Sequence, residues 1–223
     1  MTRMRLLALD TSTSAITVAV HDGSDVLSSG SVVDARRHTE RLAPLVEDVL
    51  RTAECGADDL TDIAVGTGPG PFTGLRVGLV SARVLAWSLG IPVHGVCSLD
   101  ALAHGAVERG LVDERFVVAT DARRKEVYWA TYEPHGSSAR RLTDPAVCHP
   151  AALPQDVRAL AAVGRGPALY PESLPRAVHL FDVDAESLAD LAVRRISSGE
   201  PMPVDALYLR RPDALTTAER GAR

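Results

Sequence analysis

Residues 66–78 read GTGPGPFTGLRVG, a turn rich in glycine and proline that leads directly into a helix. Glycines allow a backbone to approach a ligand or another segment closely, and prolines stiffen a turn. The first N–H groups of the helix after Thr73 lack partners within the helix and favour an anion. We therefore predict close contacts at this turn, from Gly68, Gly70, Thr73, Gly74 and Arg76.

The turn does not carry the common phosphate-binding motifs. A Walker A loop ends in Gly-Lys-Ser/Thr, and residues 66–78 contain no lysine. The spacing GxGxxG of a dinucleotide-binding loop is also missing. The sequence therefore predicts neither a phosphate-transfer loop nor a dinucleotide site at this turn.

The segments around the turn alternate between strand and helix patterns. Period-two runs bounded by turn residues predict strands, and apolar residues at three-and-four spacing predict one-faced helices. The expected order is βββαβαβα, at residues 6–10, 15–21, 26–31, 39–53, 63–66, 73–89, 92–96 and from 98 onward.

The second half of the chain shows a similar alternation of strand and helix patterns, with weaker signals. Strands are expected at 116–120 and 127–132 around a solvated basic turn, and Asp184 is expected to cap a helix over 185–198. Whether Asp121 and Arg123 at the basic turn support the fold or contact a partner stays open. We predict two α/β domains, one over residues 1–103 and a smaller one over residues 104–223. The last helix or tail of the second domain is expected to pack back on the first domain.

The helix over 73–89 has apolar or small residues on two sides. Gly74, Gly78, Ala82 and Ala86 form a row at four-residue spacing, and a second row opposite it contains Val80, Val84 and Trp87. A helix that covers one face of a sheet needs only one apolar side. The helix is therefore either enclosed within its own domain or in contact with another chain.

Composition limits the class of protein. The chain has 223 residues, 46% of them hydrophobic, which is enough for a substantial core. A formal net charge of −5 argues against binding nucleic acid unaided. No apolar run reaches membrane-spanning length, so we expect a cytoplasmic protein without a membrane contact. The three cysteines are widely spaced and predict neither a disulfide framework nor a zinc ribbon.

Four segments together resemble one protein family. They are LLALDTST at 6–13, GPGPFTGLRVG at 68–78, DARRKEVYWA at 121–130 and YLR at 208–210. The chain is similar to the TsaB (YeaZ) family, partner subunits in bacterial biosynthesis of threonylcarbamoyladenosine in tRNA. The resemblance implies an α/β fold of the actin-like and sugar-kinase-like (ASKHA) class, with two related domains of which the C-terminal one is shortened.

In this superfamily, a strand ending in Asp and followed by hydroxyl residues forms a phosphate loop. The matching positions are Asp10, Thr11, Ser12 and Thr13. The same residues can instead cap a tight hairpin through side-chain to backbone hydrogen bonds. We expect no cofactor bound by this subunit alone, and ATP or ADP at the interface with a partner stays open.

The sequence departs from the catalytic sister family, TsaD, at its metal site. TsaD proteins carry HxxxH after the corresponding strand, and the matching positions here are Ser98 and Leu102. Leucine cannot coordinate a metal. No GxSxG nucleophile motif is present either. We therefore predict no catalytic residues and no metal site.

The resemblance implies a non-catalytic scaffold that pairs with TsaD, the subunit that threonylcarbamoylates N6 of adenosine 37 in tRNAs reading codons that begin with A. The ATPase TsaE would join the pair, and tRNA would be held mainly by the partners. In isolation the chain could form a homodimer. The expected partner surface consists of Leu42, Leu45, Val46, Val49, Gly78, Val80, Ala82, Val84 and Ala86. The alternative is an autonomous enzyme of the same fold, a nucleotide-dependent kinase or ATPase or a metallopeptidase.

Overall fold

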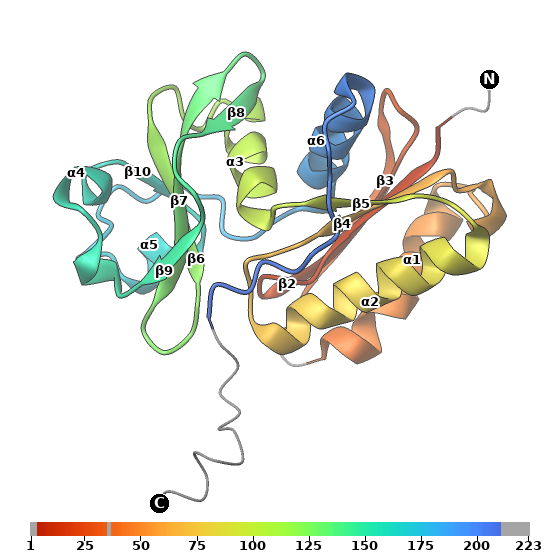
Figure 1. Cartoon of the computed structure of the whole chain (residues 1–223), viewed down its shortest axis with the longest axis horizontal. Helices are drawn as coiled ribbons and strands as arrows, with labels where there is room; N and C mark the ends of the chain where they lie inside the picture. Colours follow the sequence, from red (N-terminus) through yellow and green to blue (C-terminus); the bar gives the residue numbers. More distant parts are fainter. Residues whose placement is uncertain (1–3, 35–36, 211–223) are drawn as a thin grey trace, which may run out of the picture.

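The computed structural model describes residues 4–34 and 37–210. Five strands of the first half form a mixed sheet in the order β3-β2-β1-β4-β5 (Figure 1). Strands β1, β2 and β3 are antiparallel neighbours, whereas β4 and β5 run parallel to β1. Their bounds are β1 Leu6–Asp10, β2 Ala15–His21, β3 Val26–Val33, β4 Asp62–Gly66 and β5 Val93–Val96.

Helices cover both faces of this first sheet. Helices α1 (His38–Thr52) and α2 (Phe72–Leu89) lie on one face, and α6 (Ala185–Ser198) packs on the other (Figure 1). Strand β1 is buried along its whole length because both of its faces are covered. Residue Asp10 at its end is therefore placed between the two helical layers.

The second sheet has the order β10-β6-β7-β8, with β9 paired to β7. Helix α3 (Ser98–Glu108) packs on this sheet and also against α6, so these two helices lie between the sheets (Figure 1). The remaining elements are β6 Phe116–Asp121, β7 Val127–His135, β8 Ser138–Arg141, β9 Ala146–Cys148, β10 Ala161–Val163, α4 Gln155–Arg158, α5 Arg165–Leu169 and the 3-10 turns η1 Ala57–Asp59 and η2 Pro150–Ala152.

Most predicted elements are present, with ends shifted by at most three residues. The predicted cap is confirmed, because the Asp184 carboxylate accepts a hydrogen bond of 2.8 Å from the Ser187 N–H. Gly90 and Gly199 end their helices in the left-handed conformation, with φ of 66° and 69°. Strand β10 and the short helices α4 and α5 had no clear sequence signal.

The C-terminal segment runs back along the first sheet. The Gly95 N–H donates to the Met202 carbonyl at 3.0 Å, and the Leu207 N–H donates to the Thr67 carbonyl at 2.9 Å. This segment and α6 both pack on the first sheet, although they lie within 104–223, the predicted second domain. Residues 211–223 of that division lie outside the described residues. No helix within 4–34 and 37–210 has the length and apolar character needed to cross a bilayer.

Candidate functional site

The end of β1 holds a buried carboxylate, Asp10. One carboxylate oxygen accepts hydrogen bonds of 2.7 Å from the N–H and from the hydroxyl of Ser12. The other oxygen accepts a bond of 2.6 Å from the Ser98 hydroxyl at the start of α3. Burial raises the pKa of Asp10, while the bonds from Ser98 and Ser12 act in the opposite direction. The carboxylate is thus engaged within the chain and joins β1 to α3.

The glycine-rich turn packs directly on the segment that follows β1. The Thr11 hydroxyl donates to the Gly74 carbonyl at 2.7 Å and accepts from the Gly78 N–H at 3.0 Å. A Cβ atom added at Gly74 would lie 2.6 Å from the Thr11 carbonyl oxygen, and one at Gly78 would lie 2.5 Å from the Thr11 hydroxyl. The close contacts of Gly70 and Gly74, two of the residues predicted at this turn, are therefore made with the chain's own β1–β2 turn.

Replacing Gly78 by alanine is expected to destabilise the fold. The new methyl group would clash with Thr11 and would cost about 1–3 kcal/mol, partly offset by the higher helix propensity of alanine, about 1 kcal/mol. The measurement is the urea midpoint, with Ser81→Ala on the exposed side of α2 as the control. An unchanged midpoint for Gly78→Ala would mean that the contact with Thr11 is not tight.

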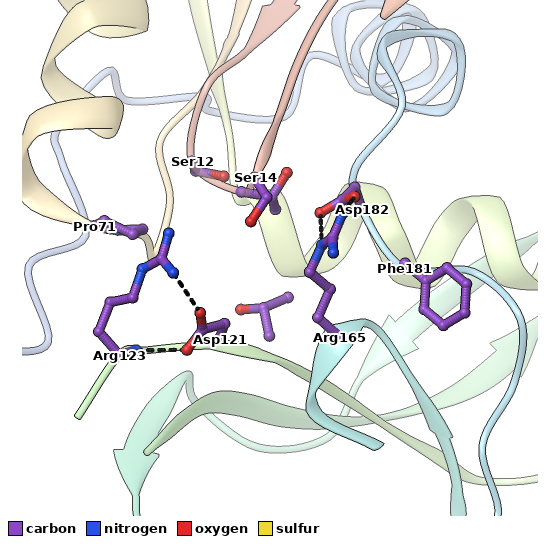
Figure 2. A pocket seen from close by; sticks show the side chains of 10 residues that line it. Ser12, Ser14, Pro71, Asp121, Arg123, Arg165, Phe181 and Asp182 are labelled. Carbon is purple, nitrogen blue, oxygen red and sulfur yellow. Dashed lines mark hydrogen bonds and ion pairs between the residues drawn. The ribbon is translucent and has the colours of Figure 1, made fainter. Parts of the chain in front are cut away.

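A cleft lies between the β1–β2 turn and the second sheet (Figure 2). Two ion pairs occupy it: Arg123 with Asp121 at 3.0 Å, and Arg165 with Asp182 at 2.6 Å. The cavity volume is about 10 Å³, which holds roughly one water molecule. In this arrangement the cleft has neither the room nor an uncompensated positive charge for a nucleotide phosphate. Its lining residues are Ser12, Thr13, Ser14, Pro71, Thr120, Asp121, Arg123, Arg165, Phe181 and Asp182.

The outer side of α2 carries an exposed apolar row, which we call the α2 row: Val80, Val84 and Trp87. Their exposed fractions are 58%, 58% and 85%. Large apolar side chains this exposed on consecutive turns of one helix are uncommon on a monomer surface. Of the two alternatives left open by the sequence, the structure excludes a helix enclosed by the described part of its own chain.

Five residues of the expected partner surface do not lie at the surface. The side of α2 that carries the small residues packs on the first sheet, and the apolar side of α1 packs on β2 and β3. The prediction that they contact a partner is therefore wrong for the described fold, because the chain's own core covers them. These residues are Leu42, Val49, Gly78, Ala82 and Ala86. Leu45 and Val46 are half-buried at the edge of α1.

The start of α2 forms an aromatic cluster that no sequence pattern indicated. The Arg76 guanidinium lies 3.7 Å from the centre of the Phe72 ring and donates a hydrogen bond of 3.0 Å to the Tyr208 hydroxyl. The Phe72 and Tyr208 rings lie 5.3 Å apart. Arg76 thus binds the C-terminal segment to α2, beside a hollow of about 440 Å³ that also involves Thr39 and Val80.

The two positions that match the metal-binding histidines of TsaD have structural roles here. The Ser98 hydroxyl binds Asp10, as described above, and also accepts from the Gly68 N–H at 3.1 Å. Leu102 is fully buried in the core between the two sheets. Neither side chain is placed to coordinate a metal.

The fold of this chain is similar to that of a protein of known structure. The structure of YeaZ from Pseudomonas aeruginosa superposes with a TM-score of 0.80 at 36% identity, over 92% of this chain and 100% of that one. The chain belongs to the TsaB (YeaZ) family. This membership confirms the predicted ASKHA fold class. A family model described as "TsaD: tRNA N6-adenosine threonylcarbamoyltransferase" matches residues 32–184, so the chain also belongs to that broader family.

Sequence relatives agree with this membership. An uncharacterized protein of Mycobacterium tuberculosis is 41% identical over 94% of this chain and 93% of its own length. The tRNA threonylcarbamoyladenosine biosynthesis protein TsaB of Escherichia coli is 37% identical over 66% of this chain and 65% of its own length. The similarity to the mycobacterial protein therefore extends over more of the chain than the similarity to the TsaB protein.

Proposed function

We propose that this chain acts in tRNA threonylcarbamoyladenosine biosynthesis as a non-catalytic scaffold that binds a TsaD-type catalytic subunit. The names of the TsaB relatives support the pathway. The observation that carries the scaffold role is the α2 row, which is exposed although the opposite side of the same helix is fully packed.

The α2 row has the properties expected of a surface that binds another protein. Trp87 and two valines present an apolar strip on a rigid helix, and the rigidity lowers the entropy lost on binding. Tryptophan is enriched among the residues that contribute most to binding energy at interfaces. We place the half-buried Leu45 and Val46 of α1 at the edge of the same surface, and Phe72 with its hollow at the other end.

The groups that would perform chemistry are engaged within the chain. Asp10 accepts three hydrogen bonds from Ser12 and Ser98, and the cleft next to it is occupied by two ion pairs. This argues against the alternative of an autonomous kinase, ATPase or metallopeptidase at this cleft. We propose that any ATP or ADP in the assembly is held jointly with the partner, because the cleft of this chain has room for only about one water molecule.

The net charge and the α2 row support proposals about the other partners. A formal net charge of −5 favours contact with tRNA mainly through the other subunits. A TsaE-type ATPase would bind the assembled pair. In the absence of partners, the α2 row would favour a homodimer, since the same apolar strip on two copies can pair about a two-fold axis.

Reconstitution of tRNA modification tests the proposal. Unmodified tRNA is incubated with the TsaD-type and TsaE-type partners of the same source, the threonylcarbamoyl donor and ATP, with and without this chain. Nucleoside mass spectrometry then quantifies threonylcarbamoyladenosine. We expect product only when the chain is present. Full product formation without it would contradict the scaffold function.

Replacing Asp10 by asparagine separates the scaffold from the enzyme alternative. The amide oxygen of asparagine can still accept hydrogen bonds from Ser12, but it cannot replace a carboxylate that binds a metal–nucleotide complex. We expect Asp10→Asn to support tRNA modification at the wild-type rate in the same reconstitution. Loss of product by a variant that still binds the TsaD-type partner would indicate that Asp10 takes part in chemistry.

A further inference from the structure

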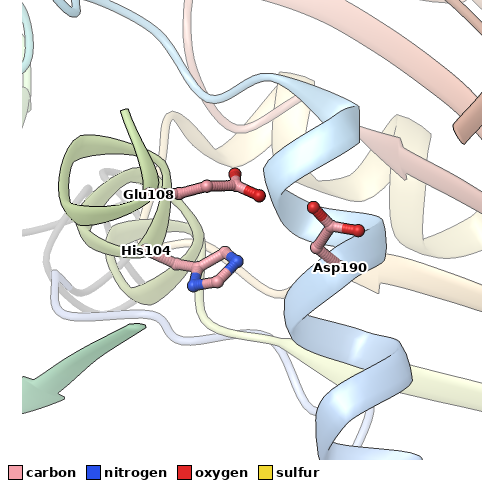
Figure 3. A group of neighbouring side chains, drawn as sticks. All are labelled: His104, Glu108 and Asp190. Atoms are coloured by element: carbon pink, nitrogen blue, oxygen red, sulfur yellow. The ribbon is translucent and has the colours of Figure 1, made fainter. Parts of the chain in front are cut away.

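Three potential metal ligands meet between α3 and α6 (Figure 3). His104 and Glu108 lie one helical turn apart on α3, and Asp190 faces them from α6. One ligand atom from each side chain lies within 4.8 Å of the other two. None of these residues takes part in the surface or the cleft described above.

The His104 ring has one free nitrogen that points into this group. Its Nδ1 atom lies 2.9 Å from the Ser138 hydroxyl on β8, whereas Nε2 is buried and has no hydrogen-bond partner. The whole residue has an exposed fraction of 0%. A buried imidazole nitrogen without a partner loses its hydration and gains nothing in return. A bound cation at Nε2 would remove this deficit.

Asp190 is held in position by a second histidine. The His21 Nδ1 atom accepts a hydrogen bond of 2.9 Å from the Gly23 N–H, so its Nε2 carries the proton and donates it to Asp190, also at 2.9 Å. This bond orients the carboxylate and leaves its second oxygen for the group around His104. Metal-binding carboxylates and imidazoles are commonly fixed by such outer hydrogen bonds, and Ser138 serves His104 in the same way.

The charges of the group also favour a cation. Glu108 and Asp190 bring two carboxyl groups together beside the His104 imidazole, and a divalent cation between them would relieve the repulsion of two negative charges. Arg194, which donates a hydrogen bond to the Ser137 hydroxyl, is a positive charge close enough to act on His104. The other charged groups near the site are Arg109, which is paired with Asp184, and Arg195, which is paired with Asp100.

We propose that His104, Glu108 and Asp190 form a binding site for a divalent transition metal of the zinc class. One imidazole and two carboxylates are a donor set that suits zinc, whereas magnesium and calcium prefer oxygen ligands alone. Zinc bonds of about 2.0–2.2 Å require the ligand atoms to come closer together than they lie in the structure, and rotation of the long Glu108 side chain can supply this. A water molecule would complete the coordination.

The site would connect the two halves of the chain. Helix α3 packs on the second sheet, and α6 packs on the first, so one ion would join both layers. The site uses residues other than Ser98 and Leu102, the positions that match the TsaD histidines. It is independent of the proposed scaffold function, since it lies on the face of the first sheet opposite to α1 and α2.

Zinc binding to tag-free protein, stripped with EDTA and desalted, tests the site. We expect one zinc per chain by metal analysis after dialysis against zinc and removal of free metal. Competition with a chromophoric chelator should show zinc affinity at least about 10-fold weaker in His104→Gln and in Glu108→Gln. Glu47→Gln, on the exposed surface of α1, is the matched control and should bind as the wild type does.

Thermal unfolding gives a second readout that separates binding from folding. Zinc should raise the melting temperature of the wild type and of Glu47→Gln, because a ligand that binds only the native state stabilises it. Zinc should not raise the melting temperature of Glu108→Gln, whose circular dichroism spectrum should be that of the native protein. No bound zinc in the wild type, or equal zinc binding by both ligand variants, would overturn the proposal.

Discussion

Replacing Val84 by arginine is expected to weaken binding of the proposed TsaD-type partner strongly while the chain stays folded. Val84 lies in the middle of the α2 row and is 58% exposed, so an arginine there can extend into solvent in the free chain. In a complex, its charge would be buried in an apolar contact without a counter-ion. Central interface residues contribute about 2–4 kcal/mol, so the affinity should fall at least about 30-fold.

Titration calorimetry with the purified partner measures this loss. The matched control is Ser198→Arg, which adds the same charge at the exposed end of α6 on the opposite face of the sheet. Circular dichroism and the melting temperature should be those of the wild type for both variants. Wild-type affinity of Val84→Arg would show that the α2 row is not the partner surface.

Replacing Ala82 by arginine is expected to unfold the chain. Ala82 lies only two residues from Val80, but it has an exposed fraction of 0% and packs in the core beneath α2. A guanidinium there has no space and no counter-ion, and buried unpaired charges belong to the few changes that cost more than about 4 kcal/mol. Val80→Arg, at the exposed side, should change the stability by no more than about 0.5 kcal/mol.

Urea denaturation compares these neighbouring variants directly. We expect Ala82→Arg to be largely unfolded without urea or to show a much lower midpoint, and Val80→Arg to unfold at the wild-type midpoint. If Ala82→Arg were as stable as the wild type, the Ala82 side of α2 would not be the side that packs on the sheet.

The sequence predicted the elements well where a local pattern determines them. Asp184 and Gly199 mark both ends of α6 because an N-cap side chain and a left-handed C-cap are local requirements. The two rows of α2 were also visible, since helical periodicity is a local property. The TsaB resemblance then supplied the fold class, which strand and helix order alone could not identify.

The choice between the two rows could not be made from the sequence. A row of small residues is typical of helix–helix contacts, yet Gly74 and Gly78 are small because Thr11 packs on them from a distant part of the chain. The group around His104 was missed for the same reason. The spacing of His104 and Glu108 fits one helix face, but only the packing of α3 on α6 brings Asp190 to them.

The most direct test of the scaffold function is threonylcarbamoyladenosine formation in the reconstituted system with three forms of this chain. The wild type and Asp10→Asn should give the same amount of product by nucleoside mass spectrometry. With the chain kept near the wild-type dissociation constant, Val84→Arg should give little more product than a reaction without the chain. Product at the wild-type level with Val84→Arg would contradict the account.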